Sequence, residues 1–167
     1  MKMHIATRSM TTFQPGEKDD VYQTRSETSP VVETTTVSVL FLTKDLLFSS
    51  RIVGVAQSRQ IELSVVSEAD QLLANTTAKQ VELVLLDLST PSCDPKQLLP
   101  QLRRLARPPK AVVAFGPHVH EAKLTAAEET GCDQVLSRGE FNNRIAEVLV
   151  KYVAVGGQTA EKVKASD

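Results

Sequence analysis

The chain has 167 residues, of which 41% are hydrophobic, and its 19 basic and 20 acidic side chains give a net charge of −1. This length and composition suit one globular domain with additional tail segments. Near-neutral charge and the lack of Trp exclude a general attraction to nucleic acid or anionic membranes and a base-stacking platform. We therefore expect neither as a partner, and no apolar run approaches the ~20 residues that span a bilayer.

The ends of the chain have compositions typical of tails. Residues 1–36 are rich in Thr, Ser, Glu and Pro without a sustained period, which predicts a disordered N-terminal tail. Residues 156–167, "GGQTAEKVKASD", predict a flexible C-terminal tail. The folded domain is then expected over residues 37–155, and a regulatory role for the Ser/Thr-rich tail is left open.

Two further features bear on the compartment. The two cysteines, Cys93 and Cys132, are too few for a disulfide framework and fit a reducing environment. The first residues, "MKMHIATRSMTTF", contain no apolar segment of a secretory signal. We therefore expect a cytoplasmic protein.

Within the domain, β-rich runs alternate with helical patterns from the start. The run "VSVLFL" (37–42) predicts a strand, and residues 45–58 predict a helix with Leu47, Ile52 and Val55 on one face. The run "IELSVV" (61–66) predicts a second strand. A helix over 67–76 is expected to begin at Ser67, with Asp70 completing a capping box.

The third unit begins at "VELVLL" (81–86), a strand followed by a helix that starts with Asp94 as N-cap and Pro95 at N1. Pro100 lies inside that helix and is expected to kink it or to reset its start. Arginines near the end of the helix complement its dipole, so a nucleic-acid contact is not needed to explain them.

The last two units follow the same alternation. The run "AVVAF" (111–115) predicts a strand, and Gly131 is expected to close the helix over 120–131. The run "QVLS" (134–137) predicts the fifth strand and 140–155 a helix with an apolar side. Five strand–helix units predict an α/β fold, in which helices cover both faces of a parallel sheet.

In such a sheet, chemistry gathers where the strands end. The residues expected at this edge of the sheet are Thr43, Lys44 and Asp45 after the first strand, Asp87 and Ser89 after the third, Phe115 and Gly116 after the fourth, and Arg138 after the fifth.

Three stretches carry a resemblance to a known family. "VLFLTKDLLFSSRI", "VELVLLDLSTPSCDPKQLL" and "GCDQVLSRGEF" resemble the receiver domain of two-component response regulators. The resemblance implies a flavodoxin-like three-layer α/β/α sandwich with a five-stranded parallel sheet in the order 2-1-3-4-5. It places Asp87 at the phospho-acceptor position and Pro91 at the usual proline.

The chain departs from the family at the metal and switch positions. The family's acidic pair, which holds Mg²⁺, aligns with Thr43 and Lys44, while Asp45 lies one residue later. A lysine cannot ligate a metal, and its charge opposes one. The resemblance therefore implies a degenerate receiver, or pseudo-receiver.

The positions after the fourth and fifth strands have also changed. The family's switch hydroxyl aligns with Phe115, or with Gly116 after a shift of one residue, and its lysine aligns with Arg138. Only Asp87 is intact. We expect Lys44 and Arg138 to form charge-assisted bonds with Asp87, which would make this carboxylate an ion-paired anchor and a poor nucleophile.

These features favour a signalling module that is not an enzyme, needs no cofactor and acts by phosphorylation-independent protein–protein interaction. Its partner would be a kinase, an output protein or another regulator, and the family implies binding through the fourth helix, fifth strand and last helix. A homodimer through this surface is a further hypothesis.

Three alternatives are left open. The first is an unconventional phospho-acceptor in a two-component phosphorelay, in which Arg138 replaces the lysine and Asp45 supplies one Mg²⁺ ligand to Asp87. The second is a small flavodoxin-like enzyme or ligand-binding domain. The third is a zinc set of Asp87, Cys93, His118 and His120, which have suitable ligand types but no diagnostic spacing.

Overall fold

A computed structural model describes residues 39–153. The tails predicted over residues 1–36 and 156–167 lie outside the described residues, and their predictions stay open. Within the described range, strands and helices alternate along the chain. The strands are β1 (Val39–Leu42), β2 (Leu63–Val66), β3 (Leu83–Asp87), β4 (Ala111–Gly116) and β5 (Gln134–Ser137). The helices are α1 (Leu46–Gln57), α2 (Ala69–Ala78), α3 (Pro95–Arg104), α4 (Glu121–Glu129) and α5 (Arg138–Tyr152), with a short 3₁₀ turn, η1 (His118–His120), before α4.

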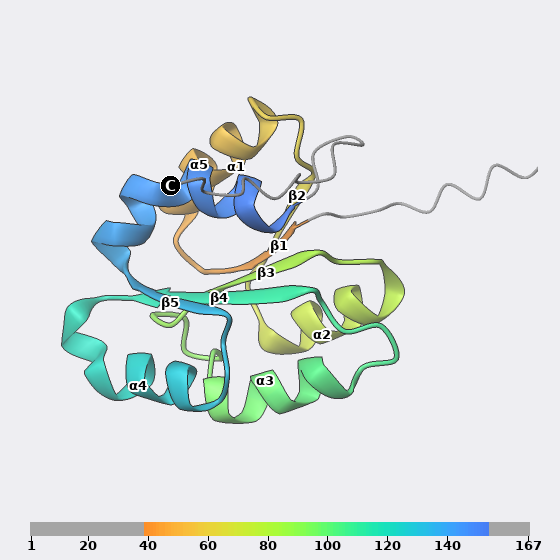
Figure 1. Cartoon of the computed structure of the whole chain (residues 1–167), viewed down its shortest axis with the longest axis vertical. Helices are drawn as coiled ribbons and strands as arrows, with labels where there is room; N and C mark the ends of the chain where they lie inside the picture. The colour runs from red at the N-terminus through yellow and green to blue at the C-terminus, as the bar shows by residue number, and fades with distance from the viewer. Residues whose placement is uncertain (1–38, 154–167) are drawn as a thin grey trace, which may run out of the picture. The chain divides into compact units, whose positions relative to one another are not determined.

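The strands form one parallel sheet in the order β2-β1-β3-β4-β5, which confirms the predicted fold class and strand order. In Figure 1, α1 and α5 lie on one face of this sheet and α2, α3 and α4 on the other. All strands run in the same direction, so their carboxyl ends meet at one edge. In the register of the sheet, Asp87 at the end of β3 lies opposite Phe115 of β4.

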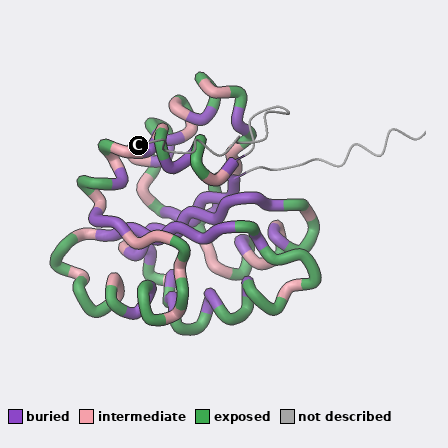
Figure 2. Tube along the Cα trace, in the orientation of Figure 1, coloured by how far each residue is buried: buried purple, intermediate pink, exposed green. Residues whose placement is uncertain are grey.

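The sheet separates two apolar cores. Figure 2 shows that the central strands are buried along their length, and all residues of β1, β3 and β4 are buried. Side chains such as Phe41 and Leu85 pack toward α1 and α5, whereas Leu40 and Leu86 pack toward α2, α3 and α4. Burial on both faces explains why these strands are continuous apolar runs instead of alternating ones.

Two details of the predicted helices are wrong. Leu47 was expected on the buried face of α1, but its side chain is 88% exposed, whereas Ile52 is fully buried. Five residues turn a helix by about 140° beyond one full turn, so these two side chains cannot share a face. The N-cap of α2 is Glu68, not Ser67, and no side chain caps the backbone there.

Other local predictions are confirmed. The Asp94 carboxylate caps α3 by accepting from the Lys96 amide, and Gly131 has a φ of 85° just beyond α4. That left-handed conformation is readily available to glycine. Pro100 lies within α3, which neither ends nor restarts there. No helix within residues 39–153 combines the length and apolar character needed to cross a membrane.

Candidate functional site

The centre of the carboxyl edge is Asp87, whose carboxylate is held by the protein itself. The Thr43 hydroxyl donates to Asp87 Oδ2 over 2.8 Å, and the Ser89 amide donates to Oδ1 over 2.9 Å. Asp87 is only 1% exposed and Thr43 is 3% exposed. Both carboxylate oxygens are therefore satisfied inside the protein, and they join the end of β1 to the loop after β3.

Lys44 is turned away from this centre. Its Nζ forms an ion pair with Glu68 Oε1 at 2.5 Å, and both side chains are about half exposed. Glu68 follows β2, which is the neighbour of β1 in the sheet. The hydrogen bond from Lys44 lowers the pKa of the Glu68 carboxyl below its ordinary value. This pair links the β1 and β2 loops at the outer part of the edge.

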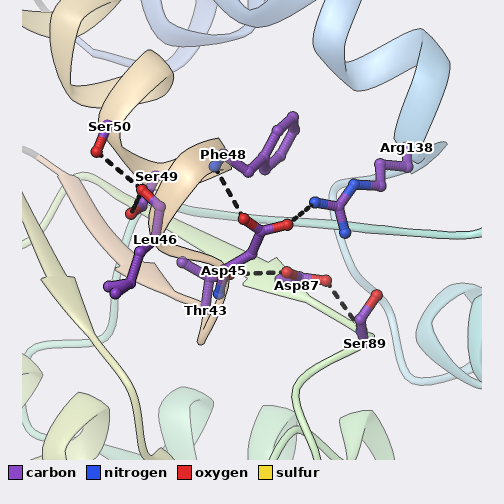
Figure 3. A network of polar contacts seen from close by, with 9 residues as sticks. All are labelled: Thr43, Asp45, Leu46, Phe48, Ser49, Ser50, Asp87, Ser89 and Arg138. Atoms are coloured by element: carbon purple, nitrogen blue, oxygen red, sulfur yellow. Dashed lines mark hydrogen bonds and ion pairs between the residues drawn. The ribbon is translucent and has the colours of Figure 1, made fainter.

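Arg138 is held by Asp45, as Figure 3 shows. Its guanidinium donates to Asp45 Oδ2 and lies 4.4 Å above the centre of the Phe48 ring. Asp45 Oδ1 accepts from the Phe48 amide and so caps α1. The Phe48 amide contributes most to lowering the pKa of Asp45, followed by the hydrogen bond from Arg138. The start of α1 is thus clasped to the start of α5.

The expected ion pairs between Asp87 and the two cations are wrong. Within residues 39–153, no basic side chain forms an ion pair with Asp87: Lys44 pairs with Glu68 and Arg138 with Asp45. The physical reason is desolvation. Each cation pairs with a partly exposed carboxylate, where the loss of hydration is smaller than it would be beside the buried Asp87.

The two residues that align with the family's switch hydroxyl, Phe115 and Gly116, are tightly packed against their neighbours. Phe115 is fully buried, and its ring stacks on Phe141 with centroids 4.1 Å apart and an interplanar angle of 4°. At Gly116, an added Cβ would lie 3.1 Å from the Leu88 Cβ. A Ser or Thr at this position would therefore press against Leu88, so the site has no room for that hydroxyl without a shift of its neighbours.

The position of Arg138 is set by the N-terminal cap of α5, because Arg138 is the first residue of that helix. The Ser137 hydroxyl accepts from the Glu140 amide at 3.2 Å, and Glu140 Oε2 accepts from the Ser137 amide at 2.8 Å, which completes a capping box. Hydrogen bonds from Ser137 lower the pKa of Glu140. Because this box starts α5 at Arg138, the guanidinium projects from the first turn toward α1.

The sequence-predicted residues therefore form two groups. Thr43, Asp87 and Ser89 meet in a buried hydrogen-bond network, and Asp45 and Arg138 meet in an ion pair that is about one-third exposed. Lys44 joins neither group.

Sequence reasoning missed Glu68, Phe48 and the capping box. Opposite charges after the neighbouring strands β1 and β2, and the S-x-x-E pattern at 137–140, were available signals for two of them.

The donor set does not fit a magnesium ion of the kind the resemblance implies. Both Asp87 oxygens accept internal hydrogen bonds, and the nearby Asp45 carboxylate is paired with Arg138. The residues at the acidic-pair positions offer one hydroxyl, already donated to Asp87, and one lysine. Nor do any three His, Cys, Asp or Glu side chains within residues 39–153 form a group that could hold a metal, and this includes the set weighed for zinc.

Comparisons with known proteins show which solved structures share this fold. No family model matches the chain, and no curated protein is detectably similar to it in sequence. Solved structures match the chain in fold. A response regulator from Hahella chejuensis aligns with a TM-score of 0.64 at 16% identity, covering 74% of this chain and 100% of its own.

Two further matches are receiver domains. That of the sensor histidine kinase PA1611 from Pseudomonas aeruginosa, with magnesium coordinated in its active-site cleft, has a TM-score of 0.61 at 12% identity over 70% of this chain and 97% of its own. The third match is a co-crystal structure of Saccharomyces cerevisiae Ypd1, a histidine phosphotransfer protein, and the receiver domain of Ssk1. It has a TM-score of 0.59 at 13% identity and covers 71% of this chain and 89% of its own. Residues 39–153 thus have the fold of receiver domains.

Proposed function

We propose that the chain is a signalling module that acts by binding another protein, and that Asp87 does not accept a phosphoryl group. The state of Asp87 carries this proposal: the side chain is 1% exposed, and both oxygens accept hydrogen bonds from Thr43 and Ser89. Phosphoryl transfer requires an attacking oxygen in line with the donor. A buried carboxylate with both oxygens engaged is better suited to anchoring two loops.

The surrounding charges support the same proposal. Phosphoryl transfer needs positive charge beside the acceptor to neutralise the charge that develops. Here Lys44 is engaged by Glu68 and Arg138 by Asp45, and Lys123 of α4 donates to the Leu88 carbonyl, so none of the three forms an ion pair with Asp87. The Asp45–Arg138 pair also ties α1 to α5 without any phosphoryl group. We infer that the domain is held in one state and presents a constant surface.

A partner of such a module is another signalling protein: a kinase, an output protein or a regulator. The Ssk1 receiver domain is crystallised with a histidine phosphotransfer protein, which supports protein binding as a use of this fold. We further propose that the chain is not an enzyme, requires no cofactor and works in the cytoplasm. A homodimer through α4, β5 and α5 is a subordinate proposal.

The competing function is that of an unconventional phospho-acceptor in a phosphorelay. It requires Arg138 to replace the family's lysine and Asp45 to supply a magnesium ligand. These two groups are paired with each other, so this function also requires the pair to open and Thr43 to release Asp87. The fold itself favours neither function.

Labelling with acetyl phosphate tests the proposal directly. The full-length protein and Asp87→Ala are incubated with radiolabelled acetyl phosphate and Mg²⁺, with an active receiver domain as positive control. We expect no label that depends on Asp87. A labelled band that responds to Mg²⁺ in a saturable manner and disappears in Asp87→Ala would refute the proposal in favour of the phospho-acceptor.

A further inference from the structure

A groove separates α2 from α3 on the face of the sheet opposite α1 and α5. Its volume is about 470 Å³, and one side is formed by α2 with the residue before it, the other by α3 with the loop before it. This volume lies within the ~300–1,000 Å³ of typical ligand pockets. The groove is separate from the Asp87 network, and neither the resemblance nor the comparisons assign it a role.

The floor of the groove is apolar. Leu98 of α3 is 2% exposed and belongs to the buried core, and Leu73 of α2 is partly buried and packs against the same core. An apolar side chain placed between them would extend the core outward. Burial of such a side chain is favourable by ~25 cal/mol for each Å² removed from water.

The walls of the groove carry charge of one sign. All ionisable residues that line it are carboxylates: Glu68, Asp70 and Asp94. Lys44 pairs with Glu68 from outside the lining. Asp70, in the first turn of α2, has no ion-pair partner among the described residues. Asp94 also has no ion-pair partner among these residues, so the groove attracts cations near Asp70 and Asp94.

Helix capping accounts for only part of this pattern. Asp94 caps α3, and Asp70 favours the start of α2 through the helix dipole. Capping explains why carboxylates lie at the starts of the two helices, but it does not explain why no Lys or Arg lines the groove. At other places the chain supplies one, since Arg103 pairs with Asp133 and Arg144 with Glu147.

We propose that this groove docks a basic amphipathic helix of the partner protein. Two apolar side chains one turn apart on that helix pack against Leu73 and Leu98, and flanking Lys or Arg side chains face Asp70 and Asp94. This is the helix-in-groove mode of recognition, in which apolar anchors at i and i+4 supply affinity and charges set orientation. The inference rests on the proposed function, because it names the partner's chemistry and its docking surface.

The test uses defined probes and the full chain. The first probe is a fluorescein-labelled peptide of ~18 residues, long enough to form a helix, with Leu at i and i+4 and Lys on the flanks. The second probe replaces each Lys by Glu. Binding is followed by fluorescence anisotropy, and the binding surface is mapped by amide chemical shifts. Sedimentation velocity on the protein alone reports self-association.

Matched variants separate the groove from general electrostatics. Gln101→Lys places a cation in the lining and is compared with Gln57→Lys, which adds the same charge on the exposed end of α1. Asp70→Asn removes a first-turn carboxylate at the groove and is compared with Glu121→Gln, which removes one from the first turn of α4.

We expect saturable binding of the Lys probe, none of the Glu probe, and shifts confined to residues 68–73 and 92–101. Gln101→Lys and Asp70→Asn should weaken binding about twofold to fivefold, with both controls at the wild-type value. Absence of saturable binding, equal losses in the controls, or shifts over α4 and α5 overturn the inference. Self-association that Gln101→Lys abolishes would assign the groove to a second copy and also overturn it.

Failure of this inference is distinguishable from failure of the proposed function. Loss of the groove interaction without Asp87-dependent labelling by acetyl phosphate refutes the docking surface alone. Asp87-dependent labelling refutes the proposed function whatever the peptide does.

Discussion

The hydroxyl of Thr43 donates a hydrogen bond of 2.8 Å to Asp87 at the buried end of β3. This bond occupies the oxygen that faces the end of β1, and the Ser89 amide occupies the other. Asp87 is therefore anchored by a hydroxyl and an amide, without an ion pair to any basic side chain within residues 39–153. Neutral donors hold a carboxylate in place, but they do not compensate its charge.

Removal of that charge should be tolerated. Asp87→Asn keeps an acceptor oxygen for one of the two donors and ends the burial of an unpaired charge, so we expect stability within ~1 kcal/mol of wild type or above it. Thr43→Val keeps the shape but leaves a buried carboxylate with one partner fewer, which should cost about 1–3 kcal/mol. Urea denaturation measures both. A loss of several kcal/mol in Asp87→Asn would instead indicate the ion-paired anchor.

The Asp45–Arg138 ion pair, which joins α1 to α5, should be measurable as a coupling energy between substitutions of the two residues. Asp45→Asn retains an N-cap oxygen and Arg138→Gln removes the guanidinium, so together they isolate the ion pair. Both side chains are about one-third exposed, so solvent screens the pair, and we expect a small favourable coupling energy that falls with added salt. Urea denaturation of the two single variants, the double variant and the wild type at two salt concentrations gives this energy.

The titration of Asp45 provides an independent check. Its folded pKa is lowered by the Phe48 amide and by Arg138, so its contribution to stability is present above its unfolded pKa and is lost as pH falls. Arg138→Gln removes one of the two main causes. We therefore expect the Asp45 pKa measured by NMR to rise in Arg138→Gln and to stay below the ordinary value, because the amide bond remains.

Glycine substitutions should have opposite effects at two positions. Gly116→Ala brings a Cβ to within 3.1 Å of Leu88 Cβ in the buried core, and overpacking of this kind costs about 1–3 kcal/mol. Gly54→Ala lies within α1 with no atom within 4 Å of the added Cβ, and should stabilise by about 0.5–1 kcal/mol. Thermal unfolding of both variants checks this. A neutral Gly116→Ala would mean that the position has room for the family's hydroxyl.

The buried thiol of Cys93 should make the fold sensitive to alkaline pH. Burial raises its pKa from 9.0 to about 12, so the folded state keeps a proton that the unfolded state loses. Stability is unaffected by this thiol below pH 9 and falls between pH 9 and 12, by about 1.4 kcal/mol per pH unit at most. Unfolding of wild type and Cys93→Ala from pH 8 to 10.5 measures the difference, and equal slopes would contradict the assignment.

The sequence alone determined the fold class, the strand order through the resemblance, and most element boundaries. The reason is that both faces of the sheet are covered, so each central strand is a continuous apolar run, and local signals such as Asp94–Pro95 and Gly131 mark helix ends through backbone chemistry close in sequence. The set of side chains at the carboxyl edge followed from the same alternation.

Only the tertiary structure decided which of those side chains pair. Lys44 and Arg138 were expected at Asp87, yet they contact Glu68 and Asp45. Sequence places charges at an edge but gives neither the direction of a side chain nor the exposure of its alternatives, and desolvation depends on that exposure. For the same reason the α2–α3 groove, where residues from two helices meet across 33 positions of the chain between Glu68 and Gln101, became visible only in the folded chain.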